Sequence, residues 1–351
     1  MKNFKIGNHI IGEGAPVYII AEMSANHAGS LERAKEIIHA AAESGADCIK
    51  IQTYTPDTIT IDSDKEYFKI LDGTWRGETL YSLYGKAYTP WDWQPLLKEE
   101  AAKAGLDFLS TPFDFTAVDF LDEIGLDFYK IASFEAVDIP LIKYTASKNK
   151  PLILSTGKCS LTDIEDALRA AHDAGNQQIA LLRCASAYPA VGADLNLLTM
   201  CDMKERFDVP VGLSDHSLGS IGAVCATALG ASIIEKHFCI NREIENPDSS
   251  FSMEPAAFKE MVKAVREAEK ARGLVHYGPT ADEENNTRFR RSLFVVKDVA
   301  KGEVFTAENI RSIRPADGLA PKYYDGIIGQ RAALSIERGT PLSWDLIEKS
   351  H

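Results

Sequence analysis

Short runs of β-branched and apolar residues alternate with longer segments of helical period over the first three quarters of the chain. Residues 31–44 and 161–174 are two of these amphipathic segments. The expected strands are residues 17–22, 48–52, 107–110, 128–131, 151–155, 179–183, 209–214 and 232–236. Eight such units in about 270 residues predict an α/β fold of the (β/α)8 barrel type. No G-x-G-x-x-G follows the first strand, which disfavours a dinucleotide-binding sheet.

Two regions depart from this alternation. Residues 53–95 form a long insertion, and the length and aromatic content of its run 73–91 are typical of a lid over a functional site. The barrel pattern spans residues 1–272, residues 273–290 read as a polar linker, and residues 291–351 predict a small domain of short strands and glycine turns. A domain of about sixty residues is marginal alone. We therefore expect it to pack on a partner surface, such as the barrel mouth of a second subunit.

Composition narrows the function classes. The chain has 351 residues, of which 45% are hydrophobic and 25% are charged, so it is not a disordered chain. The formal net charge of -13 argues against nucleic acid or an anionic membrane as a partner. Neither a signal peptide nor an apolar run of about 20 residues is found, so we expect a soluble cytoplasmic protein. The six cysteines include no C-x-x-C pair and are expected to be reduced, mostly in the core.

Polar residues stand at the carboxyl ends of all eight predicted strands, where a (β/α)8 barrel places its reactive side chains. Lys50 and Lys130 lie in the second and fourth strands. Hydroxyl groups stand around them, from Thr111, Ser133, Ser155 and Ser214. Together they predict a local site for a phosphate or carboxylate. Two alternatives stay open: each lysine forms an ordinary interior ion pair, or Lys130 is the Schiff-base lysine of an aldolase.

Two histidines, His216 and His237, end adjacent predicted strands, where their imidazoles could converge on one divalent metal. Metal sites of this kind usually mix imidazole with carboxylate. The acidic residues nearby are Glu22, Asp215, Glu235 and Asp248. The spacing fits hydrogen-bonded core histidines equally well, so this alternative remains open.

Seven short sequence blocks follow one another in a characteristic order along the predicted barrel. They are residues 20–29 (IAEMSANHAG), 49–53 (IKIQT), 110–113 (STPF), 129–133 (YKIAS), 154–157 (LSTG), 212–217 (GLSDHS) and 235–238 (EKHF). In this order they resemble the sialic acid synthase family of phosphoenolpyruvate-condensing enzymes. The tail, with residues 313–315 (IRP) and Gly329-Gln330, is similar to the antifreeze-like (SAF) domain that follows the barrel in this family. The resemblance covers nearly the whole chain and implies a domain-swapped homodimer.

Within the family, residues 22–30, 52–57 and 75–91 look most like the pseudaminic acid synthases, and Ser186 stands where the sialic acid pattern has Asn. The resemblance implies a transferase that condenses phosphoenolpyruvate with 2,4-diacetamido-2,4,6-trideoxy-β-L-altropyranose and water. The products are phosphate and pseudaminic acid, a sugar of flagellin glycosylation or surface polysaccharide. The alternatives are an N-acetylneuraminic or legionaminic acid synthase and, from a different class, a carbohydrate-binding module.

The resemblance also implies roles for single residues. A divalent metal, Mn²⁺ with Mg²⁺ or Co²⁺ as alternatives, would sit on His216 and His237 and polarise the sugar aldehyde. Glu135 would handle the proton of water, and Glu22 would contact the sugar or serve as a second acid or base. Phosphoenolpyruvate would be bound by Lys50, Thr111, Lys130, Ser133, Ser155 and Ser214. The sugar would be bound by Ser186, Tyr188, Asp248 and Arg314, the last from the SAF domain of the second subunit.

Overall fold

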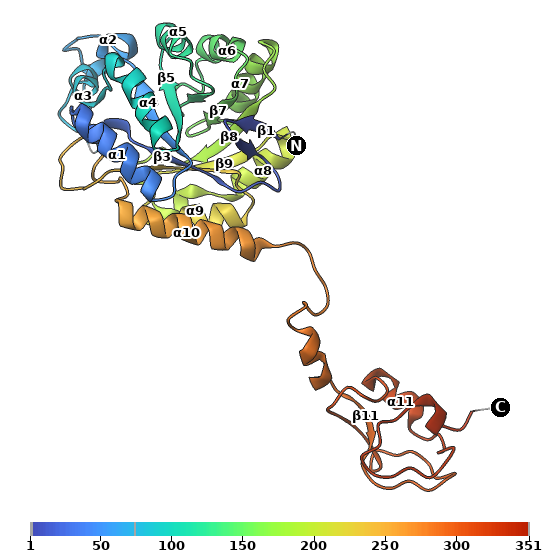
Figure 1. Ribbon diagram of the computed structural model, residues 1–351. Coiled ribbons are helices and arrows are strands. Elements are labelled where there is room, and N and C mark those ends of the chain that lie inside the picture. Colours follow the sequence, from blue (N-terminus) through green and yellow to red (C-terminus); the bar gives the residue numbers. More distant parts are fainter. Residues whose placement is uncertain (1–2, 74, 350–351) are drawn as a thin grey trace. The chain divides into compact units, whose positions relative to one another are not determined.

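The computed structural model describes residues 3–73 and 75–349, and the chain divides into two compact units at Gly273 and Leu274. In the first unit, eight parallel strands close into a barrel with helices around it (Figure 1). This confirms the predicted (β/α)8 fold. The division into a barrel over residues 1–272, a linker over 273–290 and a small domain over 291–351 remains a prediction. The end of the third segment and one residue of the 73–91 run, Thr74, lie outside the described residues.

The barrel strands pair in chain order, and the last strand returns to pair with the first. They are β3 (Tyr18–Glu22), β4 (Cys48–Thr53), β5 (Asp107–Pro112), β6 (Tyr129–Ile131), β7 (Leu152–Ser155), β8 (Ile179–Cys184), β9 (Val211–Asp215) and β10 (Ile233–His237). Each begins within two residues of its predicted start. Closure depends on a register in which Ile233 pairs with Tyr18 and His237 with Glu22.

Helices follow most strands and begin at residues suited to capping. They are α1 (Leu31–Glu43), α2 (Pro56–Ile59), α3 (Leu80–Ala87), α4 (Gln94–Lys103), α5 (Phe115–Glu123), α6 (Ile139–Ser147), α7 (Leu161–Asp173), α8 (Leu198–Phe207), α9 (Ile221–Ala228) and α10 (Pro255–Arg272). The Ser160 side chain accepts from the backbone N–H of Asp163, and the Asp163 carboxylate accepts from that of Ser160. This capping box fixes the start of α7 beside the barrel mouth.

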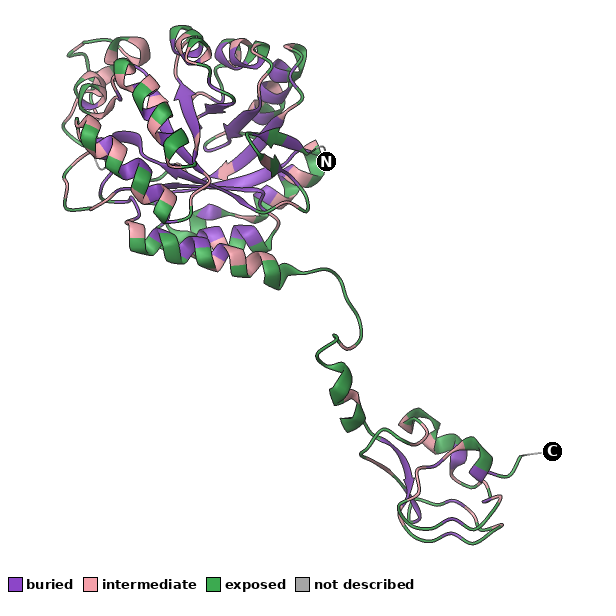
Figure 2. Cartoon of the chain, viewed as in Figure 1, coloured by how far each residue is buried: buried purple, intermediate pink, exposed green. Residues whose placement is uncertain are grey.

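Successive residues of each strand face the helices and the barrel interior in turn. Outward residues such as Ile19, Ile49 and Leu181 pack in the large core with the helices. Figure 2 shows that the strands are buried along most of their length. Inward residues near the strand starts form a separate apolar layer of Tyr18, Ile20, Cys48, Leu109, Phe128, Ile153, Ala180, Leu182 and Ile233. Residues near the strand ends, by contrast, turn a polar layer toward the mouth.

A short antiparallel hairpin, β1 (Phe4–Ile6) and β2 (His9–Ile11), closes the barrel at the end where the strands begin. Its Phe4, Ile6 and Ile11 side chains join the inner apolar layer. The interior is therefore sealed at the bottom by apolar contacts and is polar only toward the mouth. This arrangement keeps water away from one side of the polar layer.

The second unit has its own apolar core, which includes Leu293, Val299, Phe305 and Ile336. Strands β11 (Ser292–Val295) and β12 (Ile310–Ile313) pair antiparallel, and α11 spans Tyr324–Ile327. Over residues 331–336, Arg331 and Ile336 make isolated bridges to Val304 and Val299 in place of a regular strand.

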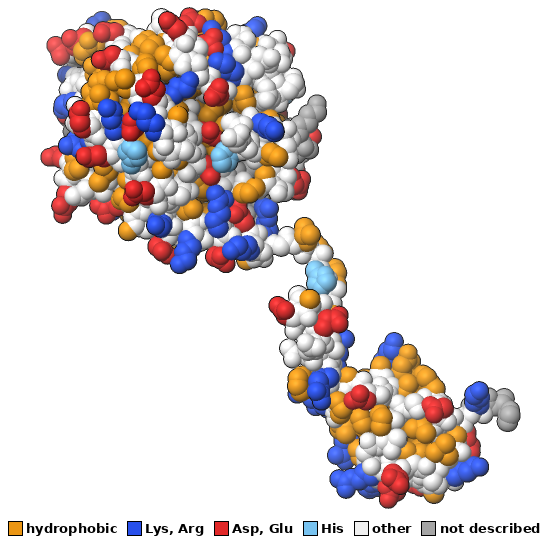
Figure 3. Space-filling model, in the orientation of Figure 1, with side chains coloured by type: hydrophobic (Ala, Val, Ile, Leu, Met, Phe, Trp, Pro, Cys, Tyr) orange, Lys and Arg blue, Asp and Glu red, His pale blue; other side chains and the backbone are white. Residues whose placement is uncertain are grey.

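Among the described residues, no helix has the length and apolar character needed to cross a bilayer. On the face of the barrel unit that Figure 3 shows, acidic and basic side chains are interspersed. A mixed surface of this kind offers no extended basic track for a phosphate backbone on that face.

Replacing Gly212 with Ala should destabilise the barrel, because a Cβ there would meet the Ile233 carbonyl oxygen at 2.2 Å and Leu182 Cδ2 at 2.8 Å. We expect G212A to lower the free energy of unfolding at the upper end of the roughly 1–3 kcal/mol typical of overpacking. Urea unfolding followed by circular dichroism measures it. The control is G192A, whose Cβ meets no atom within 4 Å and should change stability by less than about 0.5 kcal/mol. Equal midpoints for G212A and wild type would contradict this packing.

Candidate functional site

The candidate site is the polar layer inside the barrel, at the carboxyl ends of the strands. Strand alternation turns Glu22, Lys50, Lys130, Ser214 and Glu235 inward, and all five are buried. Four of them are charged groups that have left water, so each needs a partner of opposite sign. The contacts between them decide which charges persist in the folded protein.

Glu235 is the hub of a buried network of charges. Its carboxylate lies 3.2 Å from Lys130 Nζ and 3.8 Å from Lys50 Nζ, and Ser214 Oγ donates to it at 2.9 Å. Burial raises the pKa of Glu235, but Lys130, Lys50 and the Ser214 hydroxyl outweigh burial and hold it at about 2. Lys50 also forms an ion pair with Glu22. Two lysines and two glutamates thus balance in one buried cluster, so the ion-pair alternative for both lysines is what this structure contains.

Glu22 sits at the edge of this cluster. Gln52 Nε2 donates to Glu22 Oε1 at 3.2 Å and to Ser24 Oγ at 2.9 Å. Burial raises the pKa of Glu22, Lys50 opposes this shift, and Glu235 adds to it. The Glu22 carboxylate is therefore engaged mainly with Lys50 and Gln52, a contact set that positions Lys50 at the mouth.

Six buried polar side-chain atoms lack a hydrogen-bond partner within residues 3–73 and 75–349. Two of them, Glu22 Oε2 and Glu235 Oε2, belong to the ion pairs with Lys50 and Lys130, and a third is Asn26 Oδ1. The other three are Ser155 Oγ, Glu135 Oε2 and His237 Nδ1. Buried polar groups in folded proteins are nearly always paired, and unpaired ones mark sites where something else binds. All three come from the ends of β7, β6 and β10, so they converge on one mouth. We therefore place the ligand-binding centre there.

His216 and His237 face one another at this centre, with their ring centroids 5.4 Å apart. His216 Nδ1 lies 3.0 Å from the Ala185 carbonyl oxygen; this nitrogen is the donor, so Nε2 presents its lone pair to the mouth. Burial and the neighbouring His216 lower the pKa of His237 well below its usual value. Burial also lowers the pKa of His216, but Cys184, the Ala185 carbonyl and Glu235 outweigh burial and raise it above its usual value. Because a metal binds neutral imidazole, a divalent cation on this pair would have to displace the proton of His216.

Protein ligands beyond this pair are scarce. The part of the chain that the structure describes contains no cluster of three His, Cys, Asp or Glu residues arranged to hold a metal. Asp215 points outward, where Lys236 Nζ lies 2.7 Å from its carboxylate, and it therefore does not support a mixed site as expected. Two histidines are fewer than the three protein ligands of a typical catalytic zinc site, so a metal held by this pair would take its other ligands from water and substrate.

Glu135 lies in the turn after β6; its side chain is half-buried, and its Oε2 atom is out of contact with solvent. Burial raises its pKa from 4.5 to about 7, although its own backbone N–H and Lys130 act in the opposite direction. A carboxyl group with this pKa can take up and return a proton near neutral pH.

The hydroxyl groups are brought together by a close approach of the backbone. Gly157 N donates to Ser133 Oγ at 3.1 Å. A Cβ at Gly157 would lie 2.6 Å from Ser133 Oγ and 2.1 Å from Ser186 Oγ, so only glycine lets both serines approach this turn. Thr111 Oγ1 accepts from Lys50 Nζ at 3.5 Å.

Tyr188 and Asp248 border the histidine pair. The Tyr188 ring lies 4.3 Å from that of His216, and Asp248 Oδ2 accepts from the backbone N–H of Ala25 at 3.1 Å. Burial raises the pKa of Asp248, while hydrogen bonds from Ser24 and Ala25 partly offset the shift. Arg314 belongs to the second unit, directly after β12, and its place in the site stays a prediction.

Sequence reasoning undervalued two residues of the site. Glu235 was counted only as a nearby acid, yet it joins both lysines, and its inward position two residues before His237 was the available signal. Cys184 was expected to be inert core, yet its Sγ lies 3.7 Å from His216 Nδ1. Although burial raises the pKa of this thiol, His216, Ser133 and Lys130 lower it to about 7.

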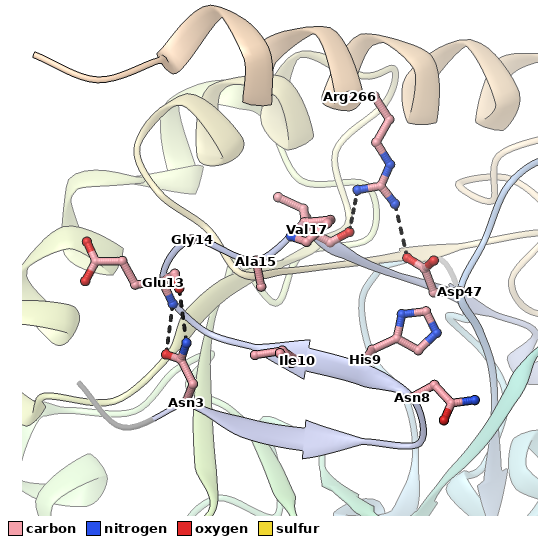
Figure 4. A pocket seen from close by; sticks show the side chains of 11 residues that line it. Asn3, Asn8, His9, Ile10, Glu13, Gly14, Ala15, Val17, Asp47 and Arg266 are labelled. Atoms are coloured by element: carbon pink, nitrogen blue, oxygen red, sulfur yellow. Dashed lines mark hydrogen bonds and ion pairs between the residues drawn. The ribbon is translucent and has the colours of Figure 1, made fainter. Parts of the chain in front are cut away.

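A cavity of about 460 Å³ lies at the opposite end of the barrel unit, under the β1–β2 hairpin (Figure 4). Several of its polar groups are paired with one another or with the backbone. Arg266 donates to the Val17 carbonyl oxygen at 2.7 Å and to Asp47 at 3.2 Å, and Asn3 exchanges two hydrogen bonds with the backbone of Glu13. Paired groups of this kind hold the hairpin in place, so we assign this cavity no chemistry.

Comparison with known proteins identifies the family. Residues 37–277 match the NeuB family and residues 290–348 match the SAF domain. The chain belongs to the NeuB family. It is 46% identical over 337 residues to the pseudaminic acid synthase of Helicobacter pylori, which covers 95% of this chain and 99% of that protein. The N,N'-diacetyllegionaminic acid synthase of Legionella pneumophila is 36% identical over 96% of this chain and 96% of that protein.

A solved relative extends the comparison to structure. The N-acetylneuraminic acid synthetase of Leptospira borgpetersenii, crystallised with citrate, has a TM-score of 0.72 and is 33% identical, over 81% of this chain and 95% of that chain. These findings confirm the family resemblance inferred from the seven blocks. The seven blocks of this NeuB-family chain contain or adjoin most of the residues that line the polar layer.

The raised pKa of Glu135 makes barrel stability depend on pH. The protonated carboxyl is favoured in the folded state, so its contribution is complete below about pH 4.5 and is lost as the pH rises toward 7. Over this range wild type should lose roughly 3 kcal/mol of unfolding free energy relative to E135Q. Urea titrations at several pH values measure the difference. The control is E36Q on the exposed face of α1, which should track wild type; the same behaviour in E135Q would contradict the burial of this carboxyl.

Proposed function

We propose that this chain is a pseudaminic acid synthase. It condenses phosphoenolpyruvate with 2,4-diacetamido-2,4,6-trideoxy-L-altrose and water, and it releases pseudaminic acid and phosphate. The observation that carries this proposal is the 46% identity to the Helicobacter pylori pseudaminic acid synthase over nearly the full length of both chains. The lower identity to a legionaminic acid synthase makes that substrate the second candidate.

The lysine cluster suits phosphoenolpyruvate, which carries a phosphate and a carboxylate. Lys50 and Lys130 supply two buried positive charges, and their present partners are glutamates of the same network. Hydroxyl donors surround them, including the unpaired Ser155 Oγ. We propose that the anion lies on Lys50, Thr111, Lys130, Ser133, Ser155 and Ser214. In this buried setting each charge-assisted hydrogen bond is stronger than in water.

The histidine pair suits the aldehyde end of the sugar. His216, through Nε2, and His237 would hold a divalent metal, with Mn²⁺ as the proposed ion and Mg²⁺ or Co²⁺ as alternatives. When bound, such a metal supplies Lewis-acid polarisation of the aldehyde oxygen. Both histidines are oriented by neighbours of this chain, His216 by the Ala185 carbonyl and His237 by ring contact with Phe251 at 5.0 Å.

The bond changes then follow in order. The methylene carbon of phosphoenolpyruvate attacks the aldehyde carbon and forms the new C–C bond. Water adds to the former enol carbon, and the tetrahedral intermediate expels phosphate by C–O cleavage. We assign the proton of this water to Glu135, whose pKa of about 7 allows it to accept the proton. Glu22 holds Lys50 in place and remains a candidate for a second acid or base.

The sugar lies between the aromatic and acidic side chains that border the histidines. We propose that Ser186, Tyr188 and Asp248 contact it from the barrel. Asp248 is fixed by the Ala25 N–H, and Ser186 is held beside Gly157, so neither needs to reorganise when the sugar binds. Arg314 completes the set in our proposal, from the SAF domain of the second subunit.

We propose a cytoplasmic, domain-swapped homodimer, whose interface would cover exposed apolar residues of both units. Near the mouth, Val191, Leu198, Leu218 and Ile221 are each more than half exposed. On the second unit, Figure 3 shows hydrophobic side chains gathered on the visible face. Leu334 and Trp344 are exposed residues of this unit. Exposed apolar groups in such number favour contact with another protein surface.

Phosphate release tests the substrate. Purified protein with Mn²⁺ and phosphoenolpyruvate should release phosphate with the 6-deoxy-altro diacetamido sugar, and chelation of the metal should abolish this release until Mn²⁺ is restored. N-acetylmannosamine and the manno-configured diacetamido sugar should give no release. Release with a manno sugar alone would move the assignment to a neuraminic or legionaminic acid synthase. Release with none of the sugars, with the sugar still bound, would favour the carbohydrate-binding module.

Complementation tests the swapped dimer. Subunits with H237A and subunits with R314A should each lose most activity as homodimers. Co-expression should restore about a quarter of wild-type activity, because half of randomly formed dimers are mixed and one site in each is complete. The control is expression of each variant alone at the same total amount of protein. No recovery in isolated mixed dimers would show that Arg314 does not act across the dimer.

A further inference from the structure

The long insertion after β4 contains a small hairpin, the 69–79 hairpin, of which residues 69–73 and 75–79 are described. Lys69 and Thr79 form an antiparallel bridge, Ile70 N donates to the Glu78 carbonyl at 2.9 Å, and Gly77 N donates to the Ile70 carbonyl at 3.0 Å. Helix α3 begins directly after it at Leu80. The hairpin therefore has its own hydrogen bonds and a fixed base. Its tip carries Trp75.

Trp75 reaches across to the opposite rim of the mouth. Its Nε1–H donates to the Pro247 carbonyl oxygen at 2.9 Å, and its ring lies 5.8 Å from that of Tyr188. Pro247 belongs to the loop between β10 and α10, and Tyr188 follows β8. One side chain of the insertion thus joins two other loops of the mouth. Loops that close over a site exclude water from it and complete its set of contacts.

Below Trp75 the aromatic contacts continue down to the histidine pair. Tyr188 lies 4.3 Å from His216 and 5.1 Å from Phe251, and Phe251 lies 5.0 Å from His237. Trp75 is therefore the outermost member of an aromatic stack that starts at the proposed aldehyde site. A six-carbon sugar whose aldehyde lies at the histidines extends its far end along this stack.

We propose that the 69–79 hairpin is a lid and that Trp75 contacts the 6-deoxy end of the sugar, selecting a methyl group over a hydroxymethyl group at C6. This inference rests on the proposed function. The Trp75 N–H is committed to Pro247, so the ring presents only carbon to the sugar. A methyl group packs against such a surface, whereas a hydroxyl group would lose water and gain no partner.

The hydrogen bond from Trp75 to Pro247 also links the lid to Asp248, the acidic residue that we propose binds the sugar. Pro247 precedes Asp248, whose backbone N–H donates to Asn246 Oδ1 at 2.9 Å and whose carboxylate holds the Ala25 N–H. The lid therefore docks on the loop that positions Asp248. Binding of the sugar to Asp248 and closure of the hairpin stabilise one another through this loop.

The experiment compares two sugars in three variants. The sugars are the 6-deoxy-altro diacetamido sugar and its analogue with a hydroxyl at C6, each with phosphoenolpyruvate and Mn²⁺. W75A should lower kcat/KM for the 6-deoxy sugar by about 10- to 100-fold, the range for a small apolar contact, and should change the value for the analogue much less. W75F, which keeps an apolar ring, should retain most of the preference. The KM for phosphoenolpyruvate should not change.

The matched control is W91F. Trp91 lies in the same insertion, stacks on Phe120 at 4.9 Å and donates to the Tyr54 carbonyl at 3.1 Å, away from the histidines. It should keep the wild-type preference between the sugars. Sugar binding should also change tryptophan fluorescence in wild type and W91F but not in W75F.

The outcomes distinguish a failure of the lid proposal from a failure of the proposed function. Unchanged kcat/KM in W75A, or an equal fall with both sugars, would overturn the contact to C6 while leaving the synthase intact. Failure of wild type to release phosphate with either sugar would instead overturn the proposed function, and the lid inference with it.

Discussion

The site depends on the pairing of four charges that the barrel removes from water. Lys50, Lys130, Glu22 and Glu235 are buried near the strand ends, and removing any one of them would leave an uncompensated charge in a medium of low polarity. Their balance explains why an interior otherwise filled with apolar side chains tolerates a polar layer. It also places two fixed positive charges at the mouth of an acidic protein. Because Glu235 contacts both lysines, its position sets the spacing between them.

Two carboxyl groups of the same polar layer have opposite net pKa shifts, because the charges around them differ. Glu235, between two lysines, has a pKa of about 2, whereas Glu135, with one distant lysine and no paired Oε2, has a pKa of about 7. The same dry environment thus gives one carboxylate that stays charged and one that exchanges a proton near neutral pH. The apolar plug at the other end of the barrel maintains the contrast, since it excludes water from below.

Much of this could be predicted from the sequence, because strand alternation and polar strand ends are local signals. The eight strand starts, both lysines and both histidines followed from position alone. The direction of Asp215 did not, because a shift of one residue turns a side chain from the interior to the helices, and the partner Lys236 is adjacent only in space. The irregular pairing in the second unit was also missed, because bridges of one residue leave no periodic pattern. The proposed role of Arg314 would depend on a second subunit, which no single chain specifies.

Closure of the barrel joins β3 to β10, whose paired residues Tyr18 and Ile233 lie far apart along the chain. On the ribosome, the first barrel strand therefore remains without its second neighbour until nearly the whole unit has been made. The β1–β2 hairpin is in the same position, because the apolar layer it covers includes Ile233. Contacts of this range form slowly. The β1–β2 hairpin is thus among the last parts of the barrel unit to become protected, and its apolar side chains Phe4, Ile6 and Ile11 stay open to a chaperone until Ile233 has been made.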